Sequence, residues 1–253
     1  IKSLFKTINN AKRPIIIAGG GIRYSNAVDE FNKLVKKLKI PVVTTWSGVD
    51  VIDHNSSLYY GHIGVYGSRA ANFCVQNADC IISLGSRLDT RITGGKPKTF
   101  GREAKIIMVD IDKGELAKRR GLNPYMKINE DCKDFLIRFM KDLKFYNKSY
   151  KSEWIDYCNR LKSTYPTVSK KFSNNEKKYV NPYLFTKELS KQLKNKDVII
   201  PDDGGHLTWF MQSFKVKFGQ RVFSAFGNSP MGYSFPAAIG ASIALGKKRV
   251  ICI

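Results

Sequence analysis

Short apolar runs alternate with amphipathic segments through the first 143 residues. Four runs predict buried strands, at 13–18, 41–45, 80–85 and 105–110. Apolar positions at helical spacing predict helices over 3–11, 26–38 and 131–143. Because short apolar strands that alternate with helices build a parallel sheet covered on both faces, the pattern predicts an α/β fold with a doubly wound, Rossmann-like sheet.

The pattern changes after residue 145. Residues 145–180 are rich in Lys, Tyr, Ser and Asn and show little strand pattern, although 152–163 has the spacing of a helix. Beyond them the pattern predicts a helix over 181–193, a strand over 197–201, a helix over 208–214, an apolar strand end at 222–226, a small-residue helix from Pro236 and a final strand at 250–253. We therefore expect a central α/β domain at 1–144, a basic linker at 145–180 and a truncated second α/β domain at 181–253, so that the chain is a fragment.

The composition changes this picture little. The net charge is +22, but the lysines are spread along the 253 residues with no nucleic-acid recognition motif, and a general bias toward Lys, Asn and Tyr explains the charge as well, so we expect no nucleic-acid partner. No apolar run reaches the length of a membrane span, and we expect no membrane partner. Five cysteines without a CxxC pair and three histidines argue against a zinc site and suit a reducing cytoplasm.

Two stretches of the second domain carry candidate chemistry. Asp203, Gly204, Gly205 and His206 follow the strand at 197–201. Glycines at a strand-to-helix turn can cradle a diphosphate and His206 can donate to it, although a lone histidine there is more often a capping or packing residue. The later loop at 227–234 contains Met231, which without further context is a core-filling side chain.

The first domain offers candidate nucleotide-binding groups after its strands. Gly19, Gly20 and Gly21 follow the first strand, and they form either a phosphate-binding turn or a plain tight turn. Gly67 and Ser68 precede a predicted helix. The remaining candidates, Arg87, Asp89 and Arg91, follow the predicted strand at 80–85. They suit the phosphates and ribose of a dinucleotide or a surface ion-pair loop.

Longer strings resemble one family. The string GNSPMGYSFPAAIGAS at 227–242 resembles the loop GxGxMGFGLPAAIGA of thiamin-diphosphate enzymes of the acetolactate synthase type, and DDGGHLTW at 202–209 is similar to their DVGQHQMW. Residues 60–94 and 105–118 are similar in order and length to the central domain of the same enzymes. The resemblance covers nearly the whole chain apart from the linker.

The resemblance implies a cofactor site in the second domain. By matching position, Met231 forces the bent conformation of thiamin diphosphate, a backbone carbonyl at Ser229 holds the aminopyrimidine, and Gly204 and His206 lie at the diphosphate. Two departures stand beside these matches. Gly205 replaces a glutamine, and Asp203 places a carboxylate where the family has an apolar residue, which puts an unaltered substrate in doubt.

The family's other ligands follow from the same resemblance. Acetolactate synthases bind a structural FAD, and the matching positions are Gly19, Gly20, Gly21, Gly67, Ser68, Arg87 and Asp110. Related decarboxylases keep the fold without flavin, so FAD remains one of two alternatives. Mg²⁺ is implied too, with its ligands in a GDG motif and an asparagine beyond Ile253, so no metal ligand is assigned here.

The implied parent enzyme decarboxylates a 2-oxo acid and joins the product to a carbonyl acceptor, as in branched-chain amino acid biosynthesis. It is a cytoplasmic homodimer or homotetramer, because family members place the cofactor between two chains. We expect the chain alone to be inactive. One alternative is a relative acting on another oxo acid or a sugar-derived substrate, and the second is a non-catalytic nucleotide-binding module.

Overall fold

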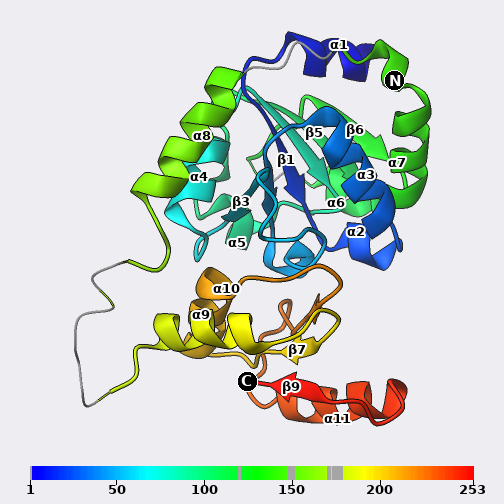
Figure 1. The fold of residues 1–253 in the computed structure, drawn as a ribbon. Helices are drawn as coiled ribbons and strands as arrows, with labels where there is room; N and C mark the ends of the chain where they lie inside the picture. Colours follow the sequence, from blue (N-terminus) through cyan, green and yellow to red (C-terminus); the bar gives the residue numbers. More distant parts are fainter. Residues whose placement is uncertain (1, 119–120, 148–151, 170–171, 173–178) are drawn as a thin grey trace. The chain divides into compact units, whose positions relative to one another are not determined.

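The chain folds into two compact units. In this computed structural model the described residues are 2–118, 121–147, 152–169, 172 and 179–253 (Figure 1). The first unit comprises Ile1–Val51 and Ser57–Tyr165, and the second comprises Ile52–Ser56 and Pro166–Ile253. Each unit is a separate compact body with its own parallel sheet.

The first unit is built on a six-stranded parallel sheet in the order β3-β2-β1-β4-β5-β6. Its strands are β1 (Pro14–Ala18), β2 (Val42–Thr44), β3 (Tyr59–His62), β4 (Cys80–Leu84), β5 (Lys105–Asp110) and β6 (Met126–Asn129). Its helices are α1 (Lys2–Asn10), α2 (Gly21–Tyr24), α3 (Val28–Leu38), α4 (Arg69–Asn77), α5 (Thr90–Thr93), α6 (Lys113–Ala117), α7 (Cys132–Lys141) and α8 (Ser152–Thr164). Short 3₁₀ turns are η1 (Trp46–Gly48), η2 (Pro97–Thr99) and η3 (Leu143–Phe145).

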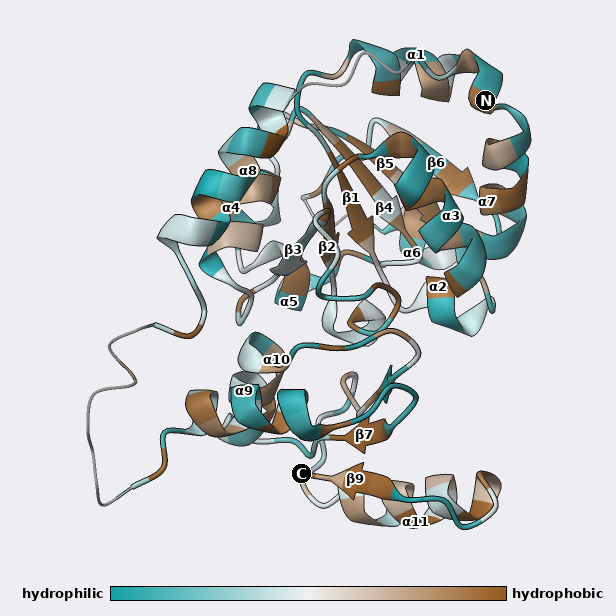
Figure 2. Cartoon of the chain, viewed as in Figure 1, coloured by the Kyte–Doolittle hydropathy of each residue, from teal (hydrophilic) through white to brown (hydrophobic). Residues whose placement is uncertain are grey.

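The four strands expected from apolar runs are present, and they lie next to one another. In the register Ile16 is opposite Val42 on β2 and Ile82 on β4, and all three side chains are buried. Figure 2 shows these central strands as the hydrophobic part of the sheet. Such uniformly apolar strands are typical of a parallel sheet with both faces covered, so the α/β fold with a doubly wound sheet is confirmed.

Strands β3 and β6 were not expected from the sequence. They lie at the two edges of the sheet, and each is four residues long. Strand β6 alternates half-buried and exposed residues, and β3 reads Tyr-Tyr-Gly-His, so neither offers a continuous apolar run. Edge strands need less apolar surface than central ones, which explains why the pattern missed both.

Helix α8 lies within the range 145–180 expected as a linker, and it packs as part of the first unit. Its residue Trp154 is buried and donates through Nε1 to the carbonyl oxygen of Pro14 at 2.9 Å. The Tyr60 hydroxyl donates to Asn159 Oδ1 at 2.9 Å, and Cys158 is fully buried in the same apolar cluster as Cys74 of α4. The helix expected at 152–163 is therefore present, while residues 148–151, 170–171 and 173–178 of the same range lie outside the described residues.

The second unit contains a three-stranded parallel sheet in the order β8-β7-β9. The strands are β7 (Val198–Ile200), β8 (Arg221–Val222) and β9 (Val250–Cys252), and the helices are α9 (Pro182–Gln192), α10 (Gly205–Ser213) and α11 (Ser234–Ala244). The segment Ile52–Ser56 belongs to this unit, where the His54 N–H donates to the Val216 carbonyl at 3.0 Å.

Three boundaries in the second unit differ from the expected ones. Helix α10 begins at Gly205 rather than at 208, because the glycine turn leads directly into it. Strand β8 ends at Val222, and 223–226 is not a strand. Helix α11 begins at Ser234, so Pro236 lies within its first turn rather than at its start, a place that tolerates proline because no intrahelical N–H bond is needed there. The apolar side chains of α11, Phe235, Ile239 and Ile243, are exposed.

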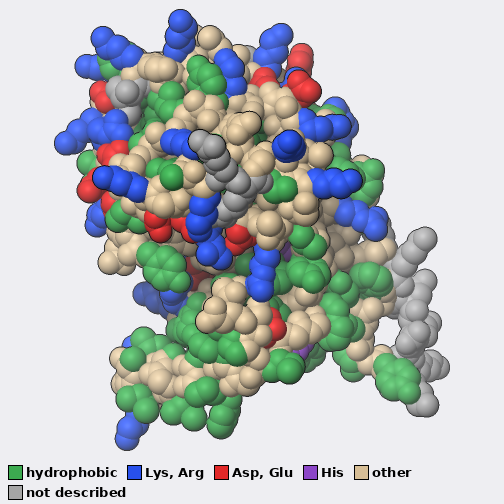
Figure 3. All heavy atoms as spheres, turned by 180° about the vertical axis from the view of Figure 1, so that it is seen from behind, with side chains coloured by type: hydrophobic (Ala, Val, Ile, Leu, Met, Phe, Trp, Pro, Cys, Tyr) green, Lys and Arg blue, Asp and Glu red, His purple; other side chains and the backbone are tan. Residues whose placement is uncertain are grey.

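The positive charge is dispersed over the first unit. Figure 3 shows Lys and Arg side chains around one face of this unit, with acidic and apolar side chains between them rather than in one continuous basic stripe. Within the part of the chain that the structure describes, no helix has both the length and the apolar character needed to cross a membrane.

Candidate functional site

A glycine turn at the carboxyl end of β7 forms the first part of the candidate site in the second unit. Gly204 has a φ of +142°, which L side chains rarely adopt, and a Cβ there would lie 2.9 Å from Cε1 of His206. The turn therefore requires glycine, and the imidazole of His206 lies over its α-carbon. Gly205 then begins α10. The Leu207 N–H already donates to the Gly204 carbonyl at 3.2 Å, so the N–H groups of Gly205 and His206 are the backbone donors that the turn can present to an anion.

The loop at 227–233 forms the second part of the site. It follows β8, which is parallel to β7, and it precedes α11. Met231 is 84% exposed, so its side chain does not fill the core of the described residues. Ser229 has a φ of +50°, and its N–H donates to the Ala225 carbonyl at 2.8 Å.

A single carboxylate brings these two parts together. Asp202 directly precedes the glycine turn, and its Oδ2 accepts the N–H of Gly232 at 2.7 Å while Oδ1 accepts the N–H of Ser234 at 3.1 Å. Gly232, which follows Met231, is thus hydrogen-bonded to Asp202, which precedes Asp203 and Gly204 in the chain. The sequence pattern did not single out Asp202. Asp202 matches the first residue of the family string DVGQHQMW, but neither this match nor an acidic residue at a strand end reveals partners 30 residues later.

Strand ends of the first unit bring the other candidate residues to one edge of the sheet. Gly19 and Gly21 follow β1, and they lie against Gly85, which follows the neighbouring strand β4. The N–H of Gly19 donates to the Leu84 carbonyl, and the N–H of Gly21 donates to the Gly85 carbonyl, both at 2.9 Å. A Cβ on Gly21 would lie 2.6 Å from Cα of Gly85. The close approach of the two loops therefore explains these glycines, and two of the three backbone donors of 19–21 are already used.

Gly20 and the glycine-rich stretch before α4 also have local roles. A Cβ on Gly20 would lie 2.8 Å from Cβ of Ser47. Gly67 lies in a turn in which a Cβ would come within 2.7 Å of the backbone nitrogen of Gly64. Ser68 is the N-cap of α4, and its hydroxyl accepts the N–H of Ala71 at 3.3 Å. These contacts build the loop whether or not a ligand binds beside it.

Arg87 and Asp110 are the remaining charged candidates at this edge. The Arg87 guanidinium pairs with Asp89, with Nη2 to Oδ2 at 3.0 Å, and its side chain is 55% exposed. Asp110 ends β5, and one of its carboxylate oxygens accepts the N–H of Asp112 at 3.0 Å. Burial raises the pKa of Asp110 above its ordinary value. Arg87 follows β4 and Asp110 is the last residue of the adjacent strand β5, so both lie at the carboxyl ends of strands, where open α/β sheets bind ligands.

An aromatic pair and a buried histidine at the same edge were not expected from the sequence. The rings of Trp46 and Tyr66 stack with centroids 5.8 Å apart and planes inclined by 20°. His62, at the end of β3, is buried, and its Nε2 lies 3.1 Å from the Tyr66 carbonyl oxygen, which makes Nε2 the protonated nitrogen. Burial lowers the pKa of His62 to about 4, so the imidazole is neutral at pH 7.

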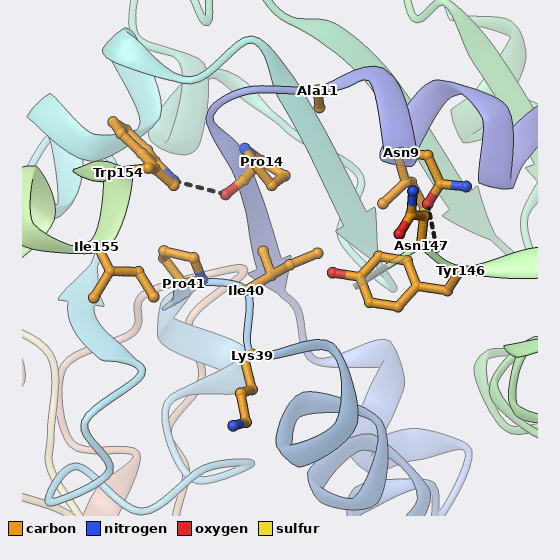
Figure 4. A pocket seen from close by; sticks show the side chains of 11 residues that line it. Asn9, Ala11, Pro14, Lys39, Ile40, Pro41, Tyr146, Asn147, Trp154 and Ile155 are labelled. Carbon is orange, nitrogen blue, oxygen red and sulfur yellow. Dashed lines mark hydrogen bonds between the residues drawn. The ribbon is translucent and has the colours of Figure 1, made fainter. Parts of the chain in front are cut away.

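A small pocket lies at the opposite end of the strands of the same sheet, near the amino ends of β1 and β2 (Figure 4). It is lined by segments from α1, the start of β1, the α3–β2 connection, the chain after η3 and α8. Several of its polar groups have partners within the protein. Trp154 Nε1 donates to the Pro14 carbonyl, and the Asn147 N–H donates to Asn9 Oδ1 at 2.9 Å. This pocket therefore lies where helix α8 and the residues that follow α7 pack onto the sheet.

Comparison with known proteins assigns families to both units. The family profile of the thiamine pyrophosphate enzyme central domain matches residues 1–139, and that of the thiamine pyrophosphate enzyme C-terminal TPP binding domain matches residues 202–253. All of this chain aligns with a probable acetolactate synthase large subunit of Methanococcus aeolicus at 38% identity and with an acetolactate synthase large subunit of Cyanidium caldarium at 35% identity. Across 96% of the chain, the acetolactate synthase isozyme 2 large subunit of Escherichia coli K12 is 29% identical. The chain spans 43%, 42% and 42% of these three proteins, respectively.

Proposed function

From the premise that the chain belongs to the thiamine pyrophosphate enzyme family, we propose that the full-length protein is an acetolactate synthase-like enzyme. It decarboxylates a 2-oxo acid and joins the product to a carbonyl acceptor, the reaction class that the names of its relatives indicate. The proposal includes a cytoplasmic location, a homodimer or homotetramer, and a role in branched-chain amino acid synthesis. Neither nucleic acid nor a membrane is a partner in it.

The observation that carries the proposal is the exposed Met231 beside the 204–206 turn. The turn suits a diphosphate because Gly204 needs glycine at its φ of +142° and because Gly205 and His206 begin α10, where a helix has backbone N–H groups without intrahelical acceptors. His206 adds a side-chain donor. Met231 is 84% exposed and is available to support the thiazolium end of the coenzyme. Thiamin diphosphate, when bound, supplies the carbon nucleophile that the side chains of this chain lack.

Mg²⁺ belongs to the proposal as the counter-ion of the diphosphate. In the described ranges no group of three or more His, Cys, Asp or Glu side chains could hold a metal ion, so we assign the ion no ligand. The protein's own contribution here is the backbone donor set of the 204–206 turn.

FAD in the first unit is the second cofactor of the proposal. It is supported by Arg87 and Asp110, which lie at the carboxyl ends of adjacent strands, and by the similarity to acetolactate synthases. The fit is partial, because the N–H groups of Gly19 and Gly21 and the hydroxyl of Ser68 already have protein partners. Calorimetric titration of the full-length protein with FAD tests this part by itself, and the absence of binding rejects it.

Release of CO₂ tests the proposed reaction. The full-length protein is supplied with thiamin diphosphate, Mg²⁺ and a series of 2-oxo acids, and the product from pyruvate is identified as acetolactate or not. No release from pyruvate rejects acetolactate synthesis. Release from a different oxo acid would instead indicate a relative with altered substrate specificity. The carboxylate of Asp203 at the turn supports that alternative. Met231→Ala is expected to lower kcat while the protein remains folded, because this side chain is exposed and adds little to the core.

A further inference from the structure

We propose that Asp202 is a positioning residue that fixes the 227–233 loop, and with it Met231, beside the 204–206 turn. The inference rests on the proposed function, because it assigns a role within the same cofactor site. The proposal assigns Asp202 no contact with substrate or with the reacting atoms. It acts through the backbone on either side of Met231.

The hydrogen bonds of Asp202 cross the site. Oδ2 accepts the Gly232 N–H at 2.7 Å, and Oδ1 accepts the Ser234 N–H at 3.1 Å. The Asp202 N–H donates in turn to the Ile253 carbonyl at 2.7 Å, which anchors the residue to the strand beside β7. One side chain at the end of the central strand of the sheet therefore fixes both the residue after Met231 and the first residue of α11.

The geometry of the loop depends on these two bonds. Gly232 has a φ of +88°, and a Cβ on it would meet nothing within 4 Å, so glycine is required here for the backbone conformation and not for space. That conformation directs the Gly232 N–H to Asp202. Met231, 84% exposed, has little packing of its own to hold it in place. The loop is thus held by hydrogen bonds of its backbone, at the end that leads into α11.

The chemistry at this position favours a carboxylate over an amide. Burial alone raises the pKa of Asp202, but the N–H groups of Gly232, Ser234, Asp203 and Tyr233 outweigh it, and the net pKa lies below the ordinary value. All of these partners are donors, and a carboxylate accepts on both oxygens. An asparagine would accept on one oxygen and turn an NH₂ group toward another donor. Asp202→Asn therefore loses one bond at nearly constant volume.

Amide hydrogen exchange on the full-length protein tests the positioning without any cofactor. In Asp202→Asn we expect the exchange rate of one of the two amides, that of Gly232 or that of Ser234, to rise about tenfold, since a hydrogen bond to a charged group contributes at least about 1.5 kcal/mol. Exchange in β7 should stay as in the wild type. Asp202→Glu keeps two acceptor oxygens and should restore part of the protection. Glu188→Gln, which removes an exposed charge on α9, is the matched control and should change neither.

Kinetics of the same variants test what the positioning does. We expect Asp202→Asn to lower kcat for CO₂ release while the KM for the 2-oxo acid stays within about twofold, and Asp202→Glu to recover part of kcat. Unchanged exchange at 232 and 234 overturns the proposal, and so does lost protection with an unchanged kcat. A wild-type protein that neither binds thiamin diphosphate nor releases CO₂ rejects the proposed function instead. The exchange data, which need no cofactor, distinguish that failure from the other two.

Discussion

Replacing Gly19 with alanine tests whether the glycine turn after β1 serves the protein's own packing. A Cβ at this position would overlap the carbonyl oxygen of Gly85 and lie 2.6 Å from its carbonyl carbon and 2.7 Å from Cβ of Ser86. These are backbone and Cβ atoms, which cannot swing aside as the end of a flexible side chain can. The only relief is to separate the ends of β1 and β4.

The expected cost follows from what that separation disrupts. Overpacking of this kind costs about 1–3 kcal/mol. The bonds from the N–H groups of Gly19 and Gly21 to the β4 side would also weaken, at about 1 kcal/mol each. Gly19→Ala should therefore destabilise the first unit by about 2–5 kcal/mol. With a denaturant slope of about 2 kcal/mol/M, the urea midpoint falls by about 1 M or more.

Tryptophan fluorescence during urea unfolding measures this effect. Trp46 and Trp154 belong to the first unit and Trp209 to the second, so a Trp209→Phe background isolates the first transition. Gly95→Ala is the control, because a Cβ at Gly95 would meet nothing within 4 Å and its midpoint should not fall. If Gly19→Ala kept the wild-type midpoint but lost binding of FAD or ADP, the packing argument would be refuted and the turn would be a ligand cradle.

Three further predictions concern other parts of the chain. Because the pKa of His62 is lowered to about 4 by burial, the unfolded state takes up a proton that the folded state refuses as the pH falls from about 6.5 toward 4. Up to about 3 kcal/mol of stability is lost in that window, and urea midpoints of His62→Gln should lack this loss. Gly240→Ala in α11, with nothing within 4 Å of the added Cβ, should stabilise the helix by about 0.5–1 kcal/mol, seen as a higher Tm of the second unit. Trp154→Phe leaves the Pro14 carbonyl without its donor and should cost about 1–2 kcal/mol in the first unit's unfolding curve, and an unchanged curve would contradict the packing of α8 onto the sheet.

The central strands of the first unit could be predicted because their signal is local. Strands β1, β4 and β5 are apolar over nearly their whole length, so hydrophobic runs alone reveal them. Strand β6 is an edge strand that alternates exposed residues, and its place depends on pairing with β5, which no local pattern encodes. Helix α8 was predicted from its spacing, but its packing onto the first unit was not, because buried Trp154 and Cys158 contact segments far away in the sequence.

The candidate site also has parts that the sequence predicts and parts that depend on contacts far apart in the sequence. The resemblance of 202–209 and 227–242 to thiamin-diphosphate enzymes predicted both the 204–206 turn and Met231 as parts of the site. That they share one strand edge depends on Asp202, whose bonds span 30 and 32 residues. For Gly19 and Gly21, the sequence left a ligand turn and a tight turn as alternatives. The distances to Gly85 show a backbone crossing between two loops, which a single sequence cannot distinguish from a phosphate cradle.

The exposed apolar face of α11 determines how this chain behaves in concentrated solution. Phe235, Ile239 and Ile243 present carbon surface to water, while a net charge of +22 keeps molecules apart by mutual repulsion. This electrostatic repulsion extends only about 10 Å at about 0.1 M salt, whereas the attraction between exposed apolar surfaces is not screened. Added salt therefore favours aggregation of the chain, whereas dilute, low-salt buffers keep it in solution.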